Sequence, residues 1–231
     1  MGADGIIHEV LDAVFQVRTP ASDSAPELSV LLWQRALDPQ RGTWSLPGGI
    51  LRADEDLSTS ARRLLAEKVD VREVAHLEQL SVFSAPHRLP GPRVIASTYL
   101  GLVRSDSTAN LPPDTRWHPV GALPEMSFDH REVVTLARTR LAAKLSYTNI
   151  AFALAPPEFA MSTLSDIYCA ALGYPVDSTN LLRILSRRGV VSATGTVGRT
   201  GRSGGRPPAL YRFAENGLRV TDEFATLRPP A

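Results

Sequence analysis

The sequence contains a single cysteine, Cys169, among its 231 residues. One cysteine cannot form a disulfide within the chain, which argues against a disulfide-stabilised secreted protein. No hydrophobic run approaches the roughly 20 residues that a membrane helix needs, and the first residues lack the basic start and apolar core of a secretory signal. We therefore expect a cytoplasmic protein that has no association with a membrane.

Several common catalytic and metal-binding patterns are also missing. The five histidines show no metal-ligand spacing with one another or with Cys169, which we interpret as a core thiol. Neither a G-x-S-x-G nucleophile motif nor a Gly-Lys-Ser/Thr phosphate loop occurs. The sequence thus predicts no catalytic residue and no bound metal, and His130 is interpreted as a packing or capping residue.

The charged residues are divided unevenly between the two ends of the chain, although the formal net charge is only +1. Residues 1–150 contain 16 Lys+Arg and 18 Asp+Glu, whereas residues 151–231 contain 9 Arg, no Lys and 6 Asp+Glu. Residues 178–214 hold seven arginines and no acidic residue. This asymmetry predicts two domains with different partners, 1–150 and 151–231, with the boundary between Tyr147 and Pro157.

The first part of the chain alternates strand-like and helical patterns. Runs rich in branched and aromatic residues predict strands at 11–18, 28–35, 73–83 and 93–103. Apolar residues at helical spacing predict helices at 57–69 and 128–145, with Asp56 and Asp129 as N-caps. The first domain is therefore expected to mix helices and strands, as in an α+β or α/β fold.

The second part has a different order of elements. Helices are predicted at 162–172 and 178–188, followed by Val190-Val191, a flexible Gly/Arg/Ser-rich tract at 194–208 and a short strand at 209–213. Tyr211 and Phe213 are expected in the core of the ribbon. Two helices followed by a two-stranded ribbon predict a winged helix-turn-helix, a DNA-binding architecture.

The stretch Trp-Ser-Leu-Pro-Gly-Gly at 44–49 begins a longer motif. With the residues that follow, it resembles the Nudix box, G-x5-E-x7-R-E-U-x-E-E-x-G-U, in which U is apolar. The matching residues are Gly49, Glu55, Arg63, Leu65, Glu67 and Val71. The resemblance implies an N-terminal Nudix-like α/β/α sandwich, and the alternative is a chance turn before an amphipathic helix.

The departures from this box bear on catalysis. In the family, three carboxylates at i, i+3 and i+4 share one helical face and hold divalent cations that neutralise a diphosphate. Here those positions are Leu64, Glu67 and Lys68. A cation in place of a carboxylate reverses an interaction of about 4 kcal/mol at about 4 Å and an effective dielectric constant near 20. The sequence therefore predicts a protein that is not an enzyme, and Asp70, in place of the box glycine, predicts an altered end of the helix.

A nucleotide pocket can outlast the loss of the metal site. Backbone N–H groups of the Gly48–Gly49 loop can bind a phosphate, and Lys68 can supply part of the missing cationic charge. For the residues of the helix, the alternative is a solvated face with ion pairs, including a purely structural Arg63–Glu55 pair. The predicted effector-binding residues are Arg35, Gly48, Gly49, Arg63, Glu67, Lys68, Phe83, Arg88, Arg93 and Tyr99.

Further matches run along nearly all of the chain. They comprise 76–80, 88–94, 98–100, 117–120, 123–124, 128–130, Leu172-Gly173, Asp177 before Asn180, and the run Gly-Arg-Pro-Pro-Ala-Leu-Tyr-Arg at 205–212. Together they resemble the Nudix-related transcriptional regulators called NrtR. The resemblance implies a homodimeric repressor of NAD biosynthesis or salvage genes that senses ADP-ribose or a related nucleotide and requires no cofactor. The departure of 180–183, Asn-Leu-Leu-Arg, from the family's Asn-Phe-Arg-Arg implies a different operator sequence.

The helix predicted at 178–188 has a polar face suited to double-stranded operator DNA, because short polar residues and arginines contact phosphates and base edges. The predicted DNA-binding residues are Ser178, Thr179, Asn180, Arg183, Arg187, Arg188, Arg199, Arg202 and Arg206. We expect the effector to weaken DNA binding, with the helix at 128–145 transmitting the change. Two alternatives remain open: an active Nudix hydrolase of ADP-ribose-type nucleotides with an accessory C-terminal domain, and an interaction adaptor that binds neither ligand nor DNA.

Overall fold

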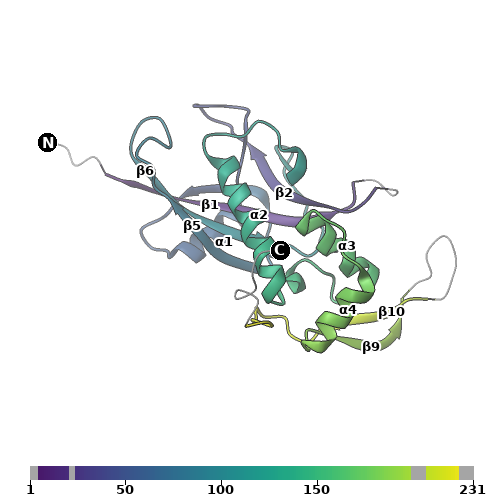
Figure 1. The fold of residues 1–231 in the computed structure, drawn as a ribbon. Coiled ribbons are helices and arrows are strands. Elements are labelled where there is room, and N and C mark those ends of the chain that lie inside the picture. The colour runs from purple at the N-terminus through teal and green to yellow at the C-terminus, as the bar shows by residue number, and fades with distance from the viewer. Residues whose placement is uncertain (1–4, 21–23, 199–206, 224–231) are drawn as a thin grey trace. The chain divides into compact units, whose positions relative to one another are not determined.

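A computed structural model describes residues 5–20, 24–198 and 207–223 (Figure 1). The chain forms two compact units: 1–16, 29–103 and 107–139 make up the first, and 17–28, 104–106 and 140–231 the second. Among the described residues, no helix has both the length and the apolar character needed to cross a bilayer.

A mixed sheet forms the centre of the first unit. Its strands are β1 (Ile7–Arg18), β2 (Glu27–Gln34), β3 (Trp44–Ser45), β4 (Gly48–Ile50), β5 (His76–Phe83), β6 (Val94–Leu102) and β7 (Thr115–Pro119). They are ordered β3-β2-β1-β6-β5, with β4 also paired to β1 and β7 to β2. The β1–β6 pair is parallel, and the pairs that β4, β5 and β7 make are antiparallel. The four strands predicted from sequence are confirmed.

Three further strands, β3, β4 and β7, were not predicted. The first two have only two and three residues, and β7 reads Thr-Arg-Trp-His-Pro, which has no alternation of apolar and polar residues. Strand β7 is instead held by its pairing with β2, from Ser29 opposite Pro119 to Trp33 opposite Thr115. Its proline stands at the last position, where a missing N–H costs the sheet least.

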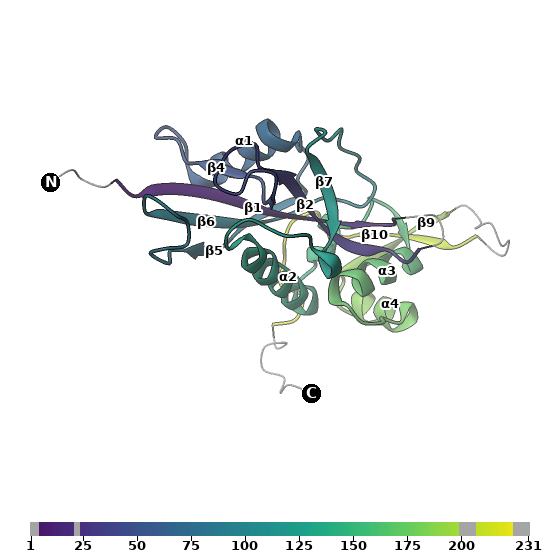
Figure 2. The ribbon, with the colours of Figure 1, turned by 90° about the horizontal axis from the view of Figure 1, so that it is seen from above.

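Helices α1 (Leu57–Val69) and α2 (His130–Tyr147) lie on opposite faces of the sheet (Figure 2). The Asp56 cap is confirmed, because its side chain accepts a 2.7 Å hydrogen bond from the Thr59 amide. The expectation of an altered helix end at Asp70 is wrong. Asp70 adopts the left-handed conformation with φ 52°, which aspartate tolerates better than most residues, and its N–H bonds the Leu65 carbonyl.

The second unit contains the 3-10 turn Ile150–Ala153, helices α3 (Met161–Leu172) and α4 (Ser178–Arg187), and strands β8 (Phe159–Ala160), β9 (Val191–Val197) and β10 (Ala209–Phe213). The sheet order is β8-β10-β9. Phe213 is buried and its ring lies 5.3 Å from that of Phe159, as expected for a core position. Two helices and this sheet form a winged helix, which confirms the predicted fold.

Strand β9 extends further than the sequence predicts. Residues 194–197 were assigned to a flexible tract, but they pair with β10, where Ala209 lies opposite Val197. Gly195 has φ 82°, a conformation that L side chains rarely adopt, and a register irregularity lies opposite it between Ala209 and Tyr211. Glycine here therefore allows the strand to continue through an irregular pair, and residues 199–206 of the predicted tract lie outside the described residues.

Candidate effector site and DNA-binding surface

The two glycines of the Nudix-like loop pack directly against the first unit's core. A Cβ atom added to Gly48 would lie 2.5 Å from the Val10 carbonyl oxygen, and one added to Gly49 would lie 2.7 Å from Cδ2 of Leu64. Gly48 and Gly49 pair with Leu11 and Val10 of β1. A larger residue at Gly48 would push the loop away from the backbone of β1, whereas one at Gly49 would require the Leu64 side chain to shift.

Arg63, in the middle of α1, bonds Glu55 in the loop before the helix and Glu67 near the end of the helix. Its Nε and Nη2 donate to the two carboxylate oxygens of Glu55 at 2.7 and 2.6 Å, and its Nη1 donates to Glu67 at 3.1 Å. The hydrogen bonds from Arg63 lower the pKa of Glu55 to about 2, against the opposing effect of burial and with help from the Arg52 amide. This bidentate pair fixes the loop on the helix, which is the structural alternative that the sequence left open for Arg63.

The three positions that carry carboxylates in the Nudix box have three different environments here. Leu64 is only 2% exposed and packs with Val10, Ala61 and Tyr99. Glu67 is half exposed and contacts Arg63. Lys68 is exposed, and its Nζ lies 5.6 Å from the centre of the Trp33 ring. The surface that α1 offers to a ligand therefore carries one carboxylate and one ammonium group at these positions.

A second polar cluster lies at the start of α2. Arg88 is 2% exposed, and it donates to both oxygens of Asp129 at 2.8 and 2.7 Å and to Glu9 at 2.9 Å. Burial by itself lowers the pKa of Arg88, but the hydrogen bonds and charges of Asp129 and Glu9 outweigh it and raise the pKa overall. Burial also raises the pKa of Glu9. These contacts support a structural role for Arg88, and the predicted effector contact stays a prediction.

The expected N-cap of this helix is also engaged in that cluster. Asp129 directly precedes α2, where a cap is expected, but both of its carboxylate oxygens accept hydrogen bonds from Arg88. The carboxylate thus serves a tertiary ion pair across 41 residues of sequence, which a local capping pattern does not predict. His130, the next residue, accepts a 3.0 Å hydrogen bond from the Leu46 amide through Nδ1 and is buried, which fits the packing role expected for it.

The remaining predicted effector residues are dispersed. Arg35 lies with its guanidinium 4.9 Å from the centre of the Phe128 ring, and the exposed Arg93 donates to the Ser84 carbonyl at 3.2 Å. Tyr99 is 3% exposed and belongs to the core beneath α1, with its hydroxyl 3.3 Å from that of Ser58. Phe83 is half-buried at the end of β5. The structure brings Gly49, Arg63, Glu67 and Lys68 together at α1, and it places Arg35 and Arg88 at the start of α2.

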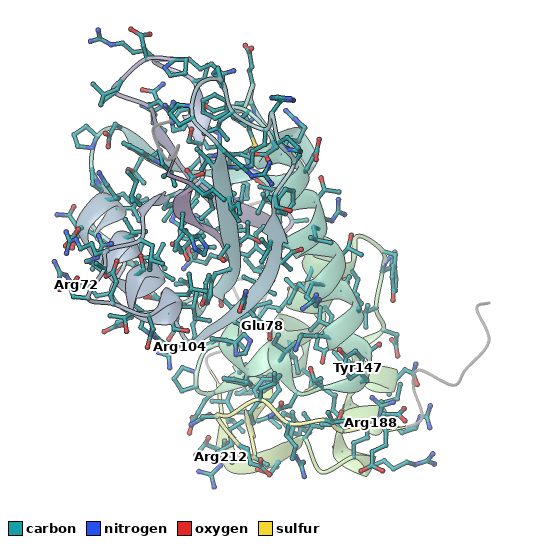
Figure 3. All side chains as sticks on the ribbon, turned by 90° about the vertical axis from the view of Figure 1, so that its left-hand side faces the viewer. Arg72, Glu78, Arg104, Tyr147, Arg188 and Arg212 are labelled. Atoms are coloured by element: carbon teal, nitrogen blue, oxygen red, sulfur yellow. The ribbon has the colours of Figure 1, made fainter. Side chains whose placement is uncertain are left out.

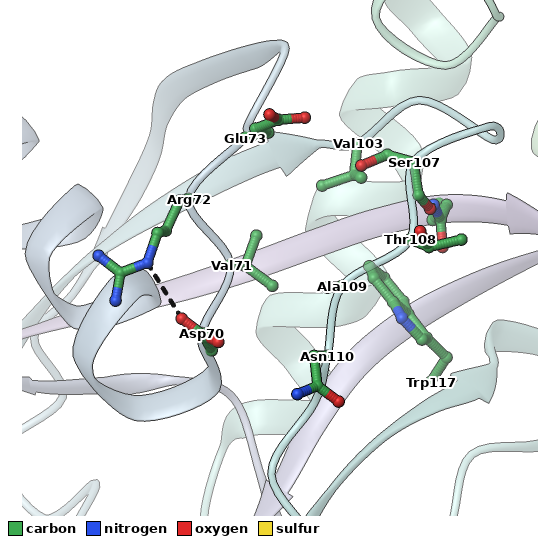
Figure 4. A pocket seen from close by; sticks show the side chains of 11 residues that line it. Asp70, Val71, Arg72, Glu73, Val103, Ser107, Thr108, Ala109, Asn110 and Trp117 are labelled. Carbon is green, nitrogen blue, oxygen red and sulfur yellow. Dashed lines mark hydrogen bonds and ion pairs between the residues drawn. The ribbon is translucent and has the colours of Figure 1, made fainter.

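A pocket of about 180 Å³ opens near the C-terminal end of α1 (Figure 4). Asp70, Arg72, Asn110 and Trp117 are among its lining residues, and Arg72 donates to Asp70 at 3.1 Å. None of the ten predicted effector residues lines this pocket. This pocket was not predicted, because its walls come from segments that are far apart in the chain.

One buried acid was also missed. Asp12 in the middle of β1 is fully buried, and within the part of the chain that the structure describes neither of its carboxylate oxygens has a hydrogen-bond partner. Burial raises the pKa of Asp12 well above its usual range, which favours the neutral carboxyl group. A single aspartate inside the apolar run Leu-Asp-Ala-Val-Phe was the available signal.

In the second unit, α4 divides into an apolar and a polar face. Leu181 and Leu185 are buried, whereas Thr179, Asn180, Arg183 and Arg187 are exposed and Ser178 is half-buried. We call these five polar residues the α4 polar face. Asp177 caps the helix by accepting from the Asn180 amide at 2.7 Å, and the Asn180 side chain accepts from Arg183 at 2.7 Å. The face predicted from sequence is thus present and carries cations without a neighbouring acid in the sequence from 178 to 214.

The other predicted DNA contacts differ from this face. Arg188 donates to the Ser146 carbonyl at 3.0 Å and to Asp222 at 2.5 Å, so its contacts are internal. Arg212, which was not predicted, is exposed on β10 (Figure 3). Arg199, Arg202 and Arg206 lie outside the described residues. The structure therefore supports Arg183, Arg187 and Arg212 as the exposed cations of the described part of this unit's helix and ribbon.

Comparison with known proteins decides the family. Residues 14–137 match the NUDIX domain, and residues 151–213 match the NrtR DNA-binding winged helix domain. The ADPR responsive transcriptional repressor NtrR of Acinetobacter baylyi is 30% identical over 195 residues, which cover 81% of this chain and 76% of that protein. The chain belongs to the NrtR family.

Solved NrtR structures agree with this assignment. The crystal structure of Shewanella oneidensis NrtR matches with a TM-score of 0.73 at 27% identity, covering 89% of this chain and 93% of that one. The same NrtR complexed with a 27mer DNA gives a TM-score of 0.72 at 28% identity, covering 89% and 92%. An ADP-ribose pyrophosphatase of Methanocaldococcus jannaschii is 26% identical over 111 residues, 46% of this chain and 63% of that protein.

The NrtR winged helix match includes α3, α4 and β8 to β10. The α4 polar face therefore belongs to a domain of a DNA-binding family, and the overall organisation is that of a transcriptional regulator with a Nudix domain. The interaction adaptor that binds no DNA is not supported by this match.

Proposed function

We propose that this protein is a transcriptional repressor of NAD biosynthesis or salvage genes whose operator affinity is lowered by ADP-ribose or a related nucleotide. The observation that carries the proposal is the pairing of a Nudix domain with an NrtR winged helix in one chain. The relatives from Acinetobacter baylyi and Methanocaldococcus jannaschii are both named for ADP-ribose, which supports that ligand class. The proposal assigns residues 1–150 to effector binding and 151–231 to DNA.

The residues of α1 do not fit the divalent cation that the Nudix family implies. Leu64 fills one carboxylate position with buried apolar volume, and Lys68 adds a positive charge at another. Glu67 remains, but Arg63 already bonds it. Within the described residues no cluster of three His, Cys, Asp or Glu side chains is arranged to hold a metal. We therefore assign no hydrolytic step to this site and propose that the effector leaves it unchanged.

In this proposal the effector's phosphates lie against the Gly48–Gly49 loop and Lys68. Lys68 is exposed and carries its charge without a carboxylate within ion-pair distance among the described residues. An ammonium group of this kind can offset part of the diphosphate charge that a metal offsets in a hydrolase. Arg63 contributes indirectly, by holding Glu55 and thereby the loop.

The α4 polar face is the proposed surface for operator DNA, with the helix in the major groove. Arginine can bond guanine bidentately, and the hydrogen bond from Arg183 to the Asn180 side chain keeps its guanidinium on the polar face. A two-fold homodimer would place two such helices on half-sites about 34–36 Å apart or a multiple of that spacing. Light scattering of the purified protein tests the dimer directly.

The decisive experiment is fluorescence anisotropy on duplexes from the protein's own genomic neighbourhood, with and without ADP-ribose. A shuffled duplex of equal length is the control for sequence, and a salt series is the control for electrostatics. Chromatography of the same mixtures follows the nucleotide. We expect sequence-selective binding that intact ADP-ribose weakens. Absence of selectivity together with conversion of ADP-ribose to AMP would overturn the proposal in favour of an enzyme.

One observation favours the hydrolase as a second candidate: the Glu55, Arg63 and Glu67 constellation of the box is intact. Leu64→Glu with Lys68→Glu restores the missing carboxylates and tests it with Mg²⁺ and ADP-ribose. Because Leu64 lies in an apolar cluster, the double variant must first show an unchanged circular dichroism spectrum. Hydrolysis by the wild type at a rate equal to that of the folded double variant would show that the native residues already suffice.

A further inference from the structure

The chain continues past the ribbon into a segment that returns to the end of α2. We call residues 214–223 the C-terminal strap; it lies beyond residues 151–213, which match the NrtR winged helix. It starts at the ribbon, where the Ala214 amide donates to the Val190 carbonyl at 2.9 Å. It ends against Tyr147, the last residue of α2, whose carbonyl accepts from the Thr221 amide at 2.7 Å.

Asn149 fixes the middle of the strap. Its backbone N–H donates to the Arg219 carbonyl at 3.1 Å. Its side-chain oxygen accepts from the backbone N–H of Arg219 at 2.7 Å, and its side-chain nitrogen donates to the Gly217 carbonyl at 2.8 Å. Asn149 is 2% exposed, and Thr148 beside it forms an antiparallel bridge with Val220. A buried asparagine with three such bonds specifies one arrangement of the two segments, because a shift would leave polar groups unpaired.

Arg188 connects this assembly to the DNA-binding helix. It stands at the C-cap of α4, and its guanidinium donates to the Ser146 carbonyl of α2 at 3.0 Å and to the Asp222 carboxylate of the strap at 2.5 Å. The Arg188 and Asp222 side chains are 19% and 11% exposed. One planar guanidinium thus joins α2, α4 and the strap, which a lysine ammonium cannot reproduce in the same fork geometry. Figure 3 labels Tyr147 and Arg188 in this unit.

We infer that the strap, through Arg188 and Asp222, makes the last turns of α2 and the C-terminal end of α4 one rigid piece that sets the position of the α4 polar face. Helix α2 is continuous from residue 130 to 147, and its residues up to 139 belong to the first unit. A rotation of α2 therefore moves α4 with it. The role in the effector response rests on the function proposed above, whereas the rigid joint does not. Arg188 and Asp222 are accordingly positioning residues, not DNA contacts.

Asp222→Asn tests the joint, because it removes the charge and keeps the shape. Asp222→Glu is the conservative rescue variant, and Glu215→Gln is the matched control, since Glu215 forms an exposed pair with Arg219 inside the strap. Hydrogen exchange of the full-length protein reports the joint without any ligand. We expect faster exchange in Asp222→Asn at the amides of Asn149 and Arg188 together, and wild-type exchange in the other two variants.

The effector response is measured as the ratio of operator Kd values with and without ADP-ribose. Effector coupling between sites is typically about 5–150-fold. We expect Asp222→Asn to lower the wild-type ratio at least about fivefold toward one, while ADP-ribose affinity by calorimetry is unchanged. Unchanged exchange would overturn the joint, and altered exchange with an unchanged ratio would overturn its role in the response. A wild type that ignores ADP-ribose would contradict the proposed function alone, because the exchange data still decide the joint.

Discussion

Two arginines of the first unit and three of the winged helix are used in opposite ways. Arg63 and Arg88 are buried or nearly so, and each is bonded to two carboxylates. Arg183, Arg187 and Arg212 are exposed, in a stretch of sequence without acidic residues. Only cations of the second kind leave their charge available to a polyanion.

This difference shows that the pairing and exposure of the charged side chains, and not only their number, determine which unit can attract a polyanion. Near-equal numbers of acidic and basic residues in the first unit accompany internal pairs, whose fields largely cancel outside the protein. Residues 151–231 contain 6 acidic residues. Of these, Asp177 caps α4 and Asp222 pairs with Arg188. Cationic charge therefore remains on the surface that faces away from the core of the winged helix.

The largest effect should come from breaking a buried pair. Arg88→Met leaves Glu9 and Asp129 without their cation, and removal of one partner of a buried pair costs about 3–5 kcal/mol of unfolding free energy. Urea denaturation followed by circular dichroism measures this loss. Arg93→Met is the control in the same loop, because Arg93 is exposed, and its change should stay within about 0.5 kcal/mol. Equal losses in the two variants would contradict the distinction between buried and exposed arginines.

His130 is a buried basic side chain whose described hydrogen bond is to a backbone amide and not to a carboxylate, so burial favours its neutral form. Burial lowers its pKa to about 4, with smaller contributions from Asp129, which raises it, and from Arg88 and Arg35, which lower it. The unfolded state, with a pKa near 6.5, binds more protons between these values, so stability falls as the pH drops from 6.5 toward 4. The contribution lost is about 3 kcal/mol.

His130→Asn tests this contribution, because the Asn side-chain oxygen can replace Nδ1 as the acceptor for the Leu46 amide. Urea denaturation at pH 7 and at pH 4 gives the free energy of unfolding for both proteins. We expect the difference between wild type and variant to change by about 3 kcal/mol between these two pH values. A difference that is independent of pH would show that His130 does not titrate differently in the folded state.

The sequence predicted best where the signal is local. The 57–69 helix and its Asp56 cap were predicted to the residue, because apolar spacing and a capping carboxylate both act within a few residues. The α4 polar face was predicted for the same reason. The Nudix and winged helix folds followed from motifs whose glycines and apolar residues have strict spatial demands, as the close approach of Gly48 to the Val10 carbonyl shows.

Tertiary partners account for most of what the sequence did not predict. Arg88 was assigned to the effector through the resemblance of its loop to that of the NrtR family, and the sequence alone did not indicate its partners Glu9 and Asp129, which are 79 and 41 residues away. The sequence distinguished Leu64 from Lys68 by charge, but it did not indicate that one is buried and the other is exposed. Asp129 and Arg188 each match a local pattern while bonding a distant residue. Nothing in composition or periodicity specifies such pairs.

An effect of intermediate size is expected on the affinity for operator DNA. Arg183→Ala removes an exposed cation of the α4 polar face, and a lost bidentate base contact costs about 1–3 kcal/mol, or about 5–150-fold in operator Kd. Selectivity against the shuffled duplex should fall in parallel. Arg62→Ala, an exposed helical arginine of the first unit, is the matched control and should leave the operator Kd unchanged. Equal weakening on both duplexes would assign Arg183 to a phosphate instead.

The smallest effect concerns Lys68, an exposed cation of the first unit. Its exposure is closer to that of Arg183 and Arg187 than to that of Arg63. Its contact with Trp33 is worth about 0.5–1 kcal/mol at an exposed site, so Lys68→Gln should lower stability by no more than that. Its proposed contact with a diphosphate predicts a loss of ADP-ribose affinity of about 5–10-fold by calorimetry, comparable to the loss of one hydrogen bond of about 1 kcal/mol. That loss should diminish as salt is added, because exposed charges are screened. An affinity that is unchanged at low salt would place the phosphates elsewhere and leave Lys68 as a solvated residue on α1.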